Sequence, residues 1–221
     1  MPFSEFDSSE YPGASIIPAR NFGYGVGVKP KYKAFCVHTP EEPADDYETT
    51  PVWFQDPRST SSTIFYLDND GDIIQMVKFE DIAWAQGTRS IDLHWKGDIG
   101  TLPVWAEDNN LNLYAVSCEV EGYAATIHRT MPVGGIQWNQ LVAMIKWCSV
   151  PRPELYLEGY PLDREHVFGH DEINLGKGDP GTRFEWDKLM YDLNTNYTNE
   201  DVQTSLDEIR NQISNIERLL G

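Results

Sequence analysis

The chain has 221 residues, 35 of them acidic and 17 basic, which gives a formal charge of −18. This charge argues against a nucleic-acid partner, because phosphates attract Lys and Arg, and equally against an anionic membrane surface. No apolar run is long enough to cross a bilayer, and the N-terminal residues lack the basic start and apolar stretch of a secretory signal. We therefore expect no nucleic-acid and no membrane partner, and we expect the protein either to stay where it is made or to be released by another agent.

The N-terminal half predicts an irregular arm, a strand and a hairpin. Residues 1–32 are rich in Gly, Pro and Ser, which favours the irregular arm. Residues 33–38, KAFCVH, are typical of a buried strand that ends at His38. An acidic loop containing proline is expected over residues 39–62. Residues 62–77 hold two apolar runs around an Asn-Asp-Gly turn, which predicts a hairpin because glycine accepts a positive φ.

The C-terminal half alternates strands and helices. Residues 112–121 are typical of a strand, and residues 135–149 have apolar positions at helical spacing. A loop and a short strand then lead to His170, and residues 184–193 favour a short helix. This order predicts an α/β protein with a mixed central β-sheet flanked by helices, formed by one domain over residues 33–195.

The last segment, residues 198–221, has a different character. Its apolar residues follow one another at alternating steps of three and four, the spacing of a coiled-coil seam. We expect a C-terminal α-helix that makes the protein a homo-oligomer; the alternative is an amphipathic helix docked on its own domain. The seam residues are Val202, Leu206, Ile209, Ile213, Ile216 and Leu220.

Cysteine and histidine placement bears on possible chemistry. The three cysteines are widely spaced in apolar segments, which favours buried, reduced thiols. The sequence contains no Cys-x-x-Cys pair, which argues against a zinc ribbon. Among the five histidines, His38 ends a strand, and His170 precedes Asp179 by nine positions. Two histidines and a carboxylate suit a catalytic zinc, which keeps one position for water. Spacing alone does not select them, since a single histidine is more often structural and Asp-Pro-Gly is usually a turn.

Five sequence blocks, spread over residues 33–189, are more specific in combination. They are FCVHT, FYLDNDGDIIQMV, WAQG, VSCEVEG, and GHDEINLGKGDPG followed by FEW. In this combination the chain resembles the zinc amidases of the N-acetylmuramoyl-L-alanine type. These share a fold with peptidoglycan-recognition proteins and with the amidase lysozymes of phages.

The resemblance implies a set of site residues. His38, His170 and Asp179 would be the zinc ligands, and zinc would lower the pKa of its bound water. Glu119 would take the proton of that water and pass it to the leaving amine, while Lys177 would stabilise the oxyanion.

The substrate side of the site is less defined by the resemblance. Trp84 is the expected substrate-binding platform, and Trp53 and Trp105 are further candidates, although each tryptophan is more often a core residue. Family members often carry His or Tyr near the position of Thr63, and His at the position of Gln86. These departures leave the substrate contacts open.

The resemblance implies an amidase that cleaves peptidoglycan between N-acetylmuramic acid and L-alanine, most simply a phage-type lysin. Such a lysin would be made in the host cytoplasm and act at the bacterial cell wall. One alternative is a non-catalytic peptidoglycan-binding protein of the same fold. Others are an intracellular amidase that recycles soluble anhydro-muropeptides, and a structural phage component with a decayed amidase.

Overall fold

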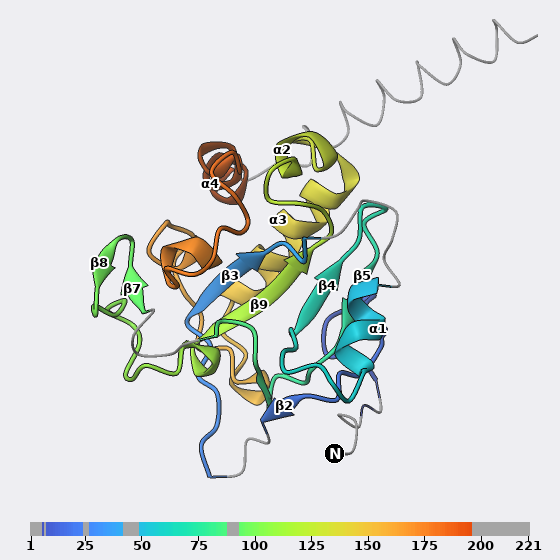
Figure 1. The fold of residues 1–221 in the computed structure, drawn as a ribbon, viewed down its shortest axis with the longest axis vertical. Helices are drawn as coiled ribbons and strands as arrows, with labels where there is room; N and C mark the ends of the chain where they lie inside the picture. Colours follow the sequence, from blue (N-terminus) through green and yellow to red (C-terminus); the bar gives the residue numbers. More distant parts are fainter. Residues whose placement is uncertain (1–5, 7, 24–26, 42–48, 88–92, 196–221) are drawn as a thin grey trace, which may run out of the picture.

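The computed structural model describes residues 6, 8–23, 27–41, 49–87 and 93–195. The predicted coiled-coil segment, residues 198–221, lies outside them. A six-stranded sheet at the centre has the strand order β1-β5-β4-β9-β3-β10, with helices packed against it (Figure 1), which confirms the predicted α/β class. The elements in chain order are β1 (Ser15–Ile16), β2 (Phe22–Gly23), β3 (Ala34–His38), α1 (Thr49–Gln55), β4 (Phe65–Leu67), β5 (Ile73–Gln75), β6 (Ile82–Ala83), β7 (His94–Trp95), β8 (Asp98–Ile99), η1 (Leu111–Leu113), β9 (Ala115–Val120), α2 (Ile127–Thr130), α3 (Ile136–Ser149), η2 (Pro153–Leu155), β10 (Val167–Gly169), η3 (His170–Glu172) and α4 (Trp186–Asn194).

In the six-stranded sheet, strands β4, β9, β3 and β10 run parallel, and only the β4–β5 pair is antiparallel. Strand β3 is buried along its whole length because both faces of the sheet are covered. Phe35 and Val37 belong to the larger core, and Ala34 and Cys36 face a smaller cluster on the opposite side. This alternation follows from the two-residue period of a strand. It puts His38 on the face that carries Ala34 and Cys36.

The predicted hairpin is formed by β4 and β5. The turn between them closes through backbone hydrogen bonds from Asp68 to Asp72 and from Gly71 to Asp68, at 3.1 and 3.2 Å. Gly71 has φ +87°, and an added Cβ would lie 2.8 Å from Ile136 of α3. The turn therefore needs glycine both for its backbone angle and for its contact with the helix.

The two predicted helices are present as α3 and α4. Helix α3 buries its apolar side, including Leu141 and Ile145, on one face of the sheet. Helix α4 packs against α3, where Trp138 Nε1 donates a hydrogen bond of 2.7 Å to Asp192 Oδ2. The three cysteines are free and buried, as expected. No helix in the described parts of the chain has the length and apolar character that a membrane span requires.

Two predictions differ from the structure. For residues 1–32 the sequence predicts an irregular arm, yet the described part adds β1 to the sheet edge beside β5 and pairs β2 with β6. Gln75 explains this attachment, because its side-chain Oε1 accepts a 2.7 Å bond from the Glu10 backbone and its Nε2 donates a 2.7 Å bond to the Glu10 carboxylate. The strand predicted over residues 112–121 begins only at Ala115, since the residues before it form η1.

Candidate metal centre and active site

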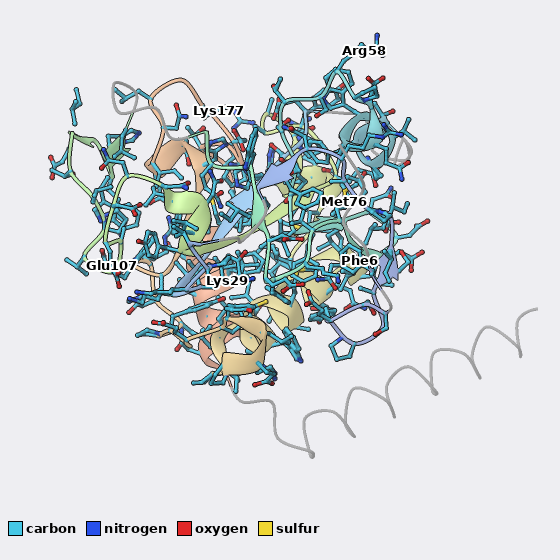
Figure 2. All side chains as sticks on the ribbon, turned by 90° about the horizontal axis from the view of Figure 1, so that it is seen from below. Phe6, Lys29, Arg58, Met76, Glu107 and Lys177 are labelled. Carbon is cyan, nitrogen blue, oxygen red and sulfur yellow. The ribbon has the colours of Figure 1, made fainter. Side chains whose placement is uncertain are left out.

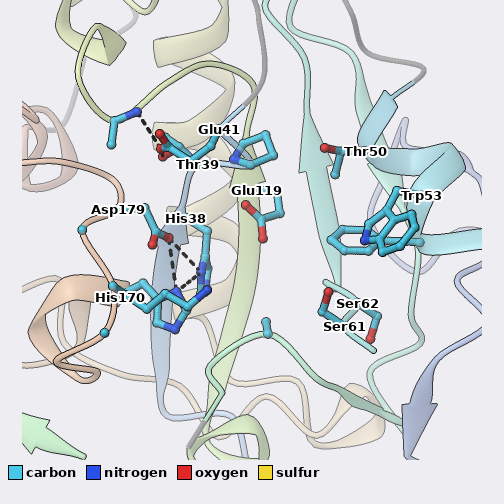
Figure 3. A pocket seen from close by; sticks show the side chains of 17 residues that line it. His38, Thr39, Glu41, Thr50, Trp53, Ser61, Ser62, Glu119, His170 and Asp179 are labelled. Carbon is cyan, nitrogen blue, oxygen red and sulfur yellow. Dashed lines mark hydrogen bonds and ion pairs between the residues drawn. The ribbon is translucent and has the colours of Figure 1, made fainter. Parts of the chain in front are cut away.

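Three potential metal ligands meet at the carboxyl ends of the central strands. His38 is the last residue of β3, and His170 directly follows β10, the parallel neighbour of β3. Neighbouring parallel strands end at the same edge of a sheet, so the two imidazoles face each other there. The Nδ1 atoms of His38 and His170 lie 3.0 Å apart, and Asp179 Oδ2 lies 3.3 Å from the first and 3.2 Å from the second. All three side chains are buried (Figure 3).

A hydrogen bond at Nε2, the ring nitrogen that does not face His38, fixes the orientation of His170. Its Nε2 lies 3.0 Å from the backbone carbonyl oxygen of Gln86. A carbonyl only accepts, so Nε2 carries the proton and the lone pair of Nδ1 points toward His38 and Asp179. A second hydrogen bond of this kind is the usual support of a metal-binding histidine.

Asn112 holds the segment that supplies this carbonyl. Its Oδ1 accepts hydrogen bonds from the backbone N–H groups of Ala85 and Gln86, at 3.1 and 2.9 Å. The side chain of Gln86 is fully buried and donates a 3.2 Å bond to the carbonyl of Ala115 in β9. One asparagine therefore sets the position of the carbonyl that orients His170.

The loop that carries Asp179 is anchored at two points. The Asp179 carbonyl accepts a 2.9 Å hydrogen bond from the backbone of Asp171. Two residues later, Gly181 has φ +102°, and a Cβ on it would lie 2.3 Å from the carbonyl oxygen of Ala124. Only glycine fits this contact, which sets the loop against the segment that follows β9.

The electrostatics of the trio favour metal binding over protonation. Burial is the main cause that lowers the pKa of His38 to about 4, and the neighbouring His170 acts in the same direction. Burial raises the pKa of Asp179, but the neighbouring imidazoles of His170 and His38 outweigh it and hold that pKa well below its usual range. A neutral imidazole beside an ionised carboxylate is the state that a metal ion requires of its ligands.

These three residues fit a divalent metal. Their ligand atoms all lie within 4.8 Å of one another. Among the described residues, these three form the group that could hold a metal ion. The observed separations of 3.0 to 3.3 Å are close to the spacing of about 3.3 Å between ligands of a tetrahedral ion with bonds of about 2.0 Å. Two imidazoles and one carboxylate are also the donor set typical of a catalytic zinc.

Glu119 stands next to the trio. It is the register partner of His38 in the parallel β3–β9 pair, so both side chains leave the same face of the sheet. Glu119 and the exposed Lys177 line the same cavity as the three potential ligands. The structure therefore brings together all five residues expected to act as ligands or catalysts.

The cavity has a volume of about 500 Å³ and opens beside the ligand trio. Helix α1 contributes its wall residues Thr50, Trp53 and Phe54, and Ser61 and Ser62 lie below them (Figure 3). The site thus combines a buried metal-type centre with a wall that is aromatic and uncharged.

Other expected substrate contacts lie elsewhere. Trp84 is 44% exposed, but it lines a separate hollow with Asn109, Asn110 and Asn112 rather than the cavity of the trio. Trp105 is buried, stacks on Phe168 and is a core residue. The platform that does line the cavity is Trp53.

Thr63 and Gln86, the two positions that depart from the family pattern, also lie outside the cavity lining. Thr63 is buried and donates a 3.1 Å hydrogen bond to Ser117, and the Gln86 side chain faces Ala115. Neither side chain lines the cavity.

Two residues near the site carry no sequence signal. Asn112 acts through backbone contacts to a segment 26 positions away, which no local pattern indicates. Glu41 accepts hydrogen bonds from Thr39 and from the backbone of Ala124, both at 2.8 Å, and so connects the loop after β3 with the loop after β9. In the sequence, Glu41 is only one of several acidic residues in a loop.

Comparison with known proteins agrees with this geometry. The family model of N-acetylmuramoyl-L-alanine amidases matches residues 29–182. A selenomethionine derivative of AmpD superposes with a TM-score of 0.57 at 19% identity, over 83% of this chain and 96% of that one. The amidase AmiD from E. coli, in complex with anhydro-N-acetylmuramic acid-L-Ala-D-gamma-Glu-L-Lys, gives a TM-score of 0.50 at 18% identity over 86% and 65%. No curated protein sequence matches this one significantly. The family match spans well over half of the sequence, and the chain belongs to the N-acetylmuramoyl-L-alanine amidase family.

Proposed function

We propose that this amidase depends on zinc and acts as a phage-type lysin, cleaving the amide between the lactyl group of N-acetylmuramic acid and L-alanine. The observation that carries the proposal is the buried trio of His38, His170 and Asp179 beside Glu119 in one cavity. Family membership supports the peptidoglycan substrate. A complete ligand set beside a carboxylate argues against the alternatives of a non-catalytic binding protein and of a decayed amidase.

The roles of the residues follow from their positions. When bound by the trio, zinc would supply a Lewis acid that polarises a carbonyl and makes water easier to deprotonate. Glu119 accepts the proton of the attacking water and passes it to the leaving amine. Lys177 places its ammonium group near the scissile carbonyl and stabilises the negative charge that develops on its oxygen. Trp53 offers a flat apolar surface to the substrate.

Digestion of purified cell walls tests the activity. The protein, loaded with zinc, should release free L-alanine N-termini from the walls, and mass spectrometry should find stem peptides separated from intact glycan. A chelator should stop the release, and zinc should restore it. Walls that bind the protein without any new N-termini would favour a non-catalytic binding protein instead.

A second candidate substrate is a soluble anhydro-muropeptide. The observation in its favour is the fold similarity to AmiD, whose structure contains such a molecule. Intact walls and soluble anhydro-muropeptides should therefore be compared at equal concentrations of scissile bonds. A lysin cleaves the walls efficiently, whereas a recycling amidase acts on the soluble compound and leaves the walls intact.

The proposal includes self-association through residues 198–221 and action at the cell wall after release from the host cytoplasm. Several copies in one assembly would strengthen attachment to a repetitive wall by avidity. Analytical ultracentrifugation of the full chain and of a chain ending at residue 197 should give an oligomer and a monomer. A monomer in both cases would refute the oligomer.

A further inference from the structure

The charges that line the cavity suggest which stem peptides this amidase accepts. Among the described lining residues, the only lysine or arginine is Lys177, and the carboxylates are Glu41, Glu119 and Asp179. In the proposed function Lys177, Glu119 and Asp179 act on the scissile amide. Among the charged residues described in the lining, Glu41 is therefore the one left to contact the rest of the substrate.

Glu41 is held in place at the cavity. One oxygen, Oε1, accepts the hydrogen bonds from Thr39 and Ala124, both at 2.8 Å. Within the described parts of the chain, no donor bonds the other oxygen, Oε2. The backbone of Glu41 has φ +62°, a conformation that residues other than glycine adopt infrequently. These contacts give the carboxylate a defined position three residues from His38.

Among the described residues, no lysine or arginine forms an ion pair with Glu41, and Lys177 is the only lysine or arginine that lines the cavity. The opposite wall, formed by α1 and by Ser61 and Ser62, contributes hydroxyl groups and aromatic rings. Arg58 lies over the ring of Trp53, but its guanidinium is paired with Asp56 at 2.6 Å, and it lies apart from Lys177 on the molecule (Figure 2).

A carboxylate on the substrate would meet like charge here without a counter-ion. Like charges placed together at an interface are strongly unfavourable and suppress the wrong partner. The second residue of the stem is D-glutamate, linked through its γ-carboxyl group, and its α-carboxyl group is either free or amidated. We propose that the enzyme selects stem peptides in which this α-carboxyl group is amidated, and that Glu41 determines the selection. This inference rests on the proposed amidase function.

Two synthetic muramoyl tripeptides test the proposal. Both have the stem L-Ala-D-Glu-L-Lys, and they differ only in a free or amidated α-carboxyl group on D-glutamate. For the zinc-loaded protein, we expect kcat/KM to be about tenfold higher for the amidated compound at low ionic strength. At about 1 M salt, where the Debye length is about 3 Å, the ratio should shrink.

Substitution of Glu41 identifies the residue responsible. Glu41→Gln keeps an oxygen acceptor for Thr39 and Ala124 but removes the charge, so the ratio should fall to about threefold or less. Glu154→Gln removes an exposed carboxylate that does not line the cavity, and should keep the wild-type ratio. The salt series uses only the wild-type protein and gives an answer even if the Glu41 variant does not fold.

The outcomes separate the two proposals. Equal rates on both compounds, or faster cleavage of the free acid, would overturn the selectivity while the amidase function stands. A preference that survives Glu41→Gln and high salt would overturn the role of Glu41. Cleavage of neither compound nor of cell walls would overturn the proposed function, and the selectivity with it.

Discussion

Replacing Asn112 with alanine should weaken metal binding although Asn112 does not touch the metal site. Its Oδ1 accepts two backbone N–H groups, from Ala85 and Gln86, and alanine leaves both without this partner. The Gln86 side chain is fully buried and its N–H donor is partly buried, so the loss of both bonds should lower the free energy of unfolding by about 2 kcal/mol. The freed Gln86 carbonyl would no longer hold His170, and zinc affinity should fall about tenfold.

Two measurements check this chain of effects. Urea denaturation of chelated protein gives the change in unfolding free energy, and competition with a chromophoric chelator gives the zinc affinity. Asn112→Asp retains the acceptor oxygen and should recover most of both losses. Asn139→Ala removes an exposed asparagine side chain on α3 that donates a hydrogen bond to the nearby Gly134 carbonyl, and should change neither. Unchanged zinc affinity in a folded Asn112→Ala protein would refute the proposed support of His170.

Three further outcomes are expected. Glu119→Gln should retain zinc, measured by metal analysis, yet lose about a hundredfold or more of wall-digesting activity; wild-type turnover would contradict its role as the base. For the chelated protein, His38 stays neutral down to about pH 4 when folded but takes up a proton near pH 6.5 when unfolded, so unfolding free energy should fall by about 2 kcal/mol between pH 7 and 5. Urea titrations should show this fall reduced in His38→Asn, and an equal fall in both proteins would contradict the assignment. Gly181→Ala should destabilise by at least about 2 kcal/mol, whereas Gly178→Ala, with open space around it, should cost under about 1 kcal/mol; similar midpoints for the two would contradict the steric account.

Strand and helix patterns carried enough information to predict much of the fold. The buried strand that ends at His38, the hairpin around Gly71 and the helix on residues 135–149 all depend on local periodicity and turn chemistry, which a single sequence displays. The attachment of the N-terminal segment depends instead on hydrogen bonds between Glu10 and Gln75, 65 positions apart. Composition alone does not indicate such a contact.

The candidate site also combines features that local sequence patterns predict with features that they do not. Local spacing does not distinguish His38 from the other four histidines, and only the family resemblance associates it with His170 and Asp179. The structure adds the physical reason, which is that β3 and β10 are parallel neighbours although their histidines are 132 positions apart. Trp84 followed the family pattern but lines a different hollow, because side-chain direction is set by contacts that the pattern does not contain.

The pairing of β3 with β10 also determines when the three potential metal ligands can come together. During synthesis His38 emerges early, but its partner strand and Asp179 follow only after about 130 further residues, and strands this distant in the chain pair late. The nascent chain therefore has no complete ligand set until its last sheet strand has docked. Under the proposed zinc dependence, uptake of the ion would report finished folding, and time-resolved metal binding would follow the closure of the sheet directly.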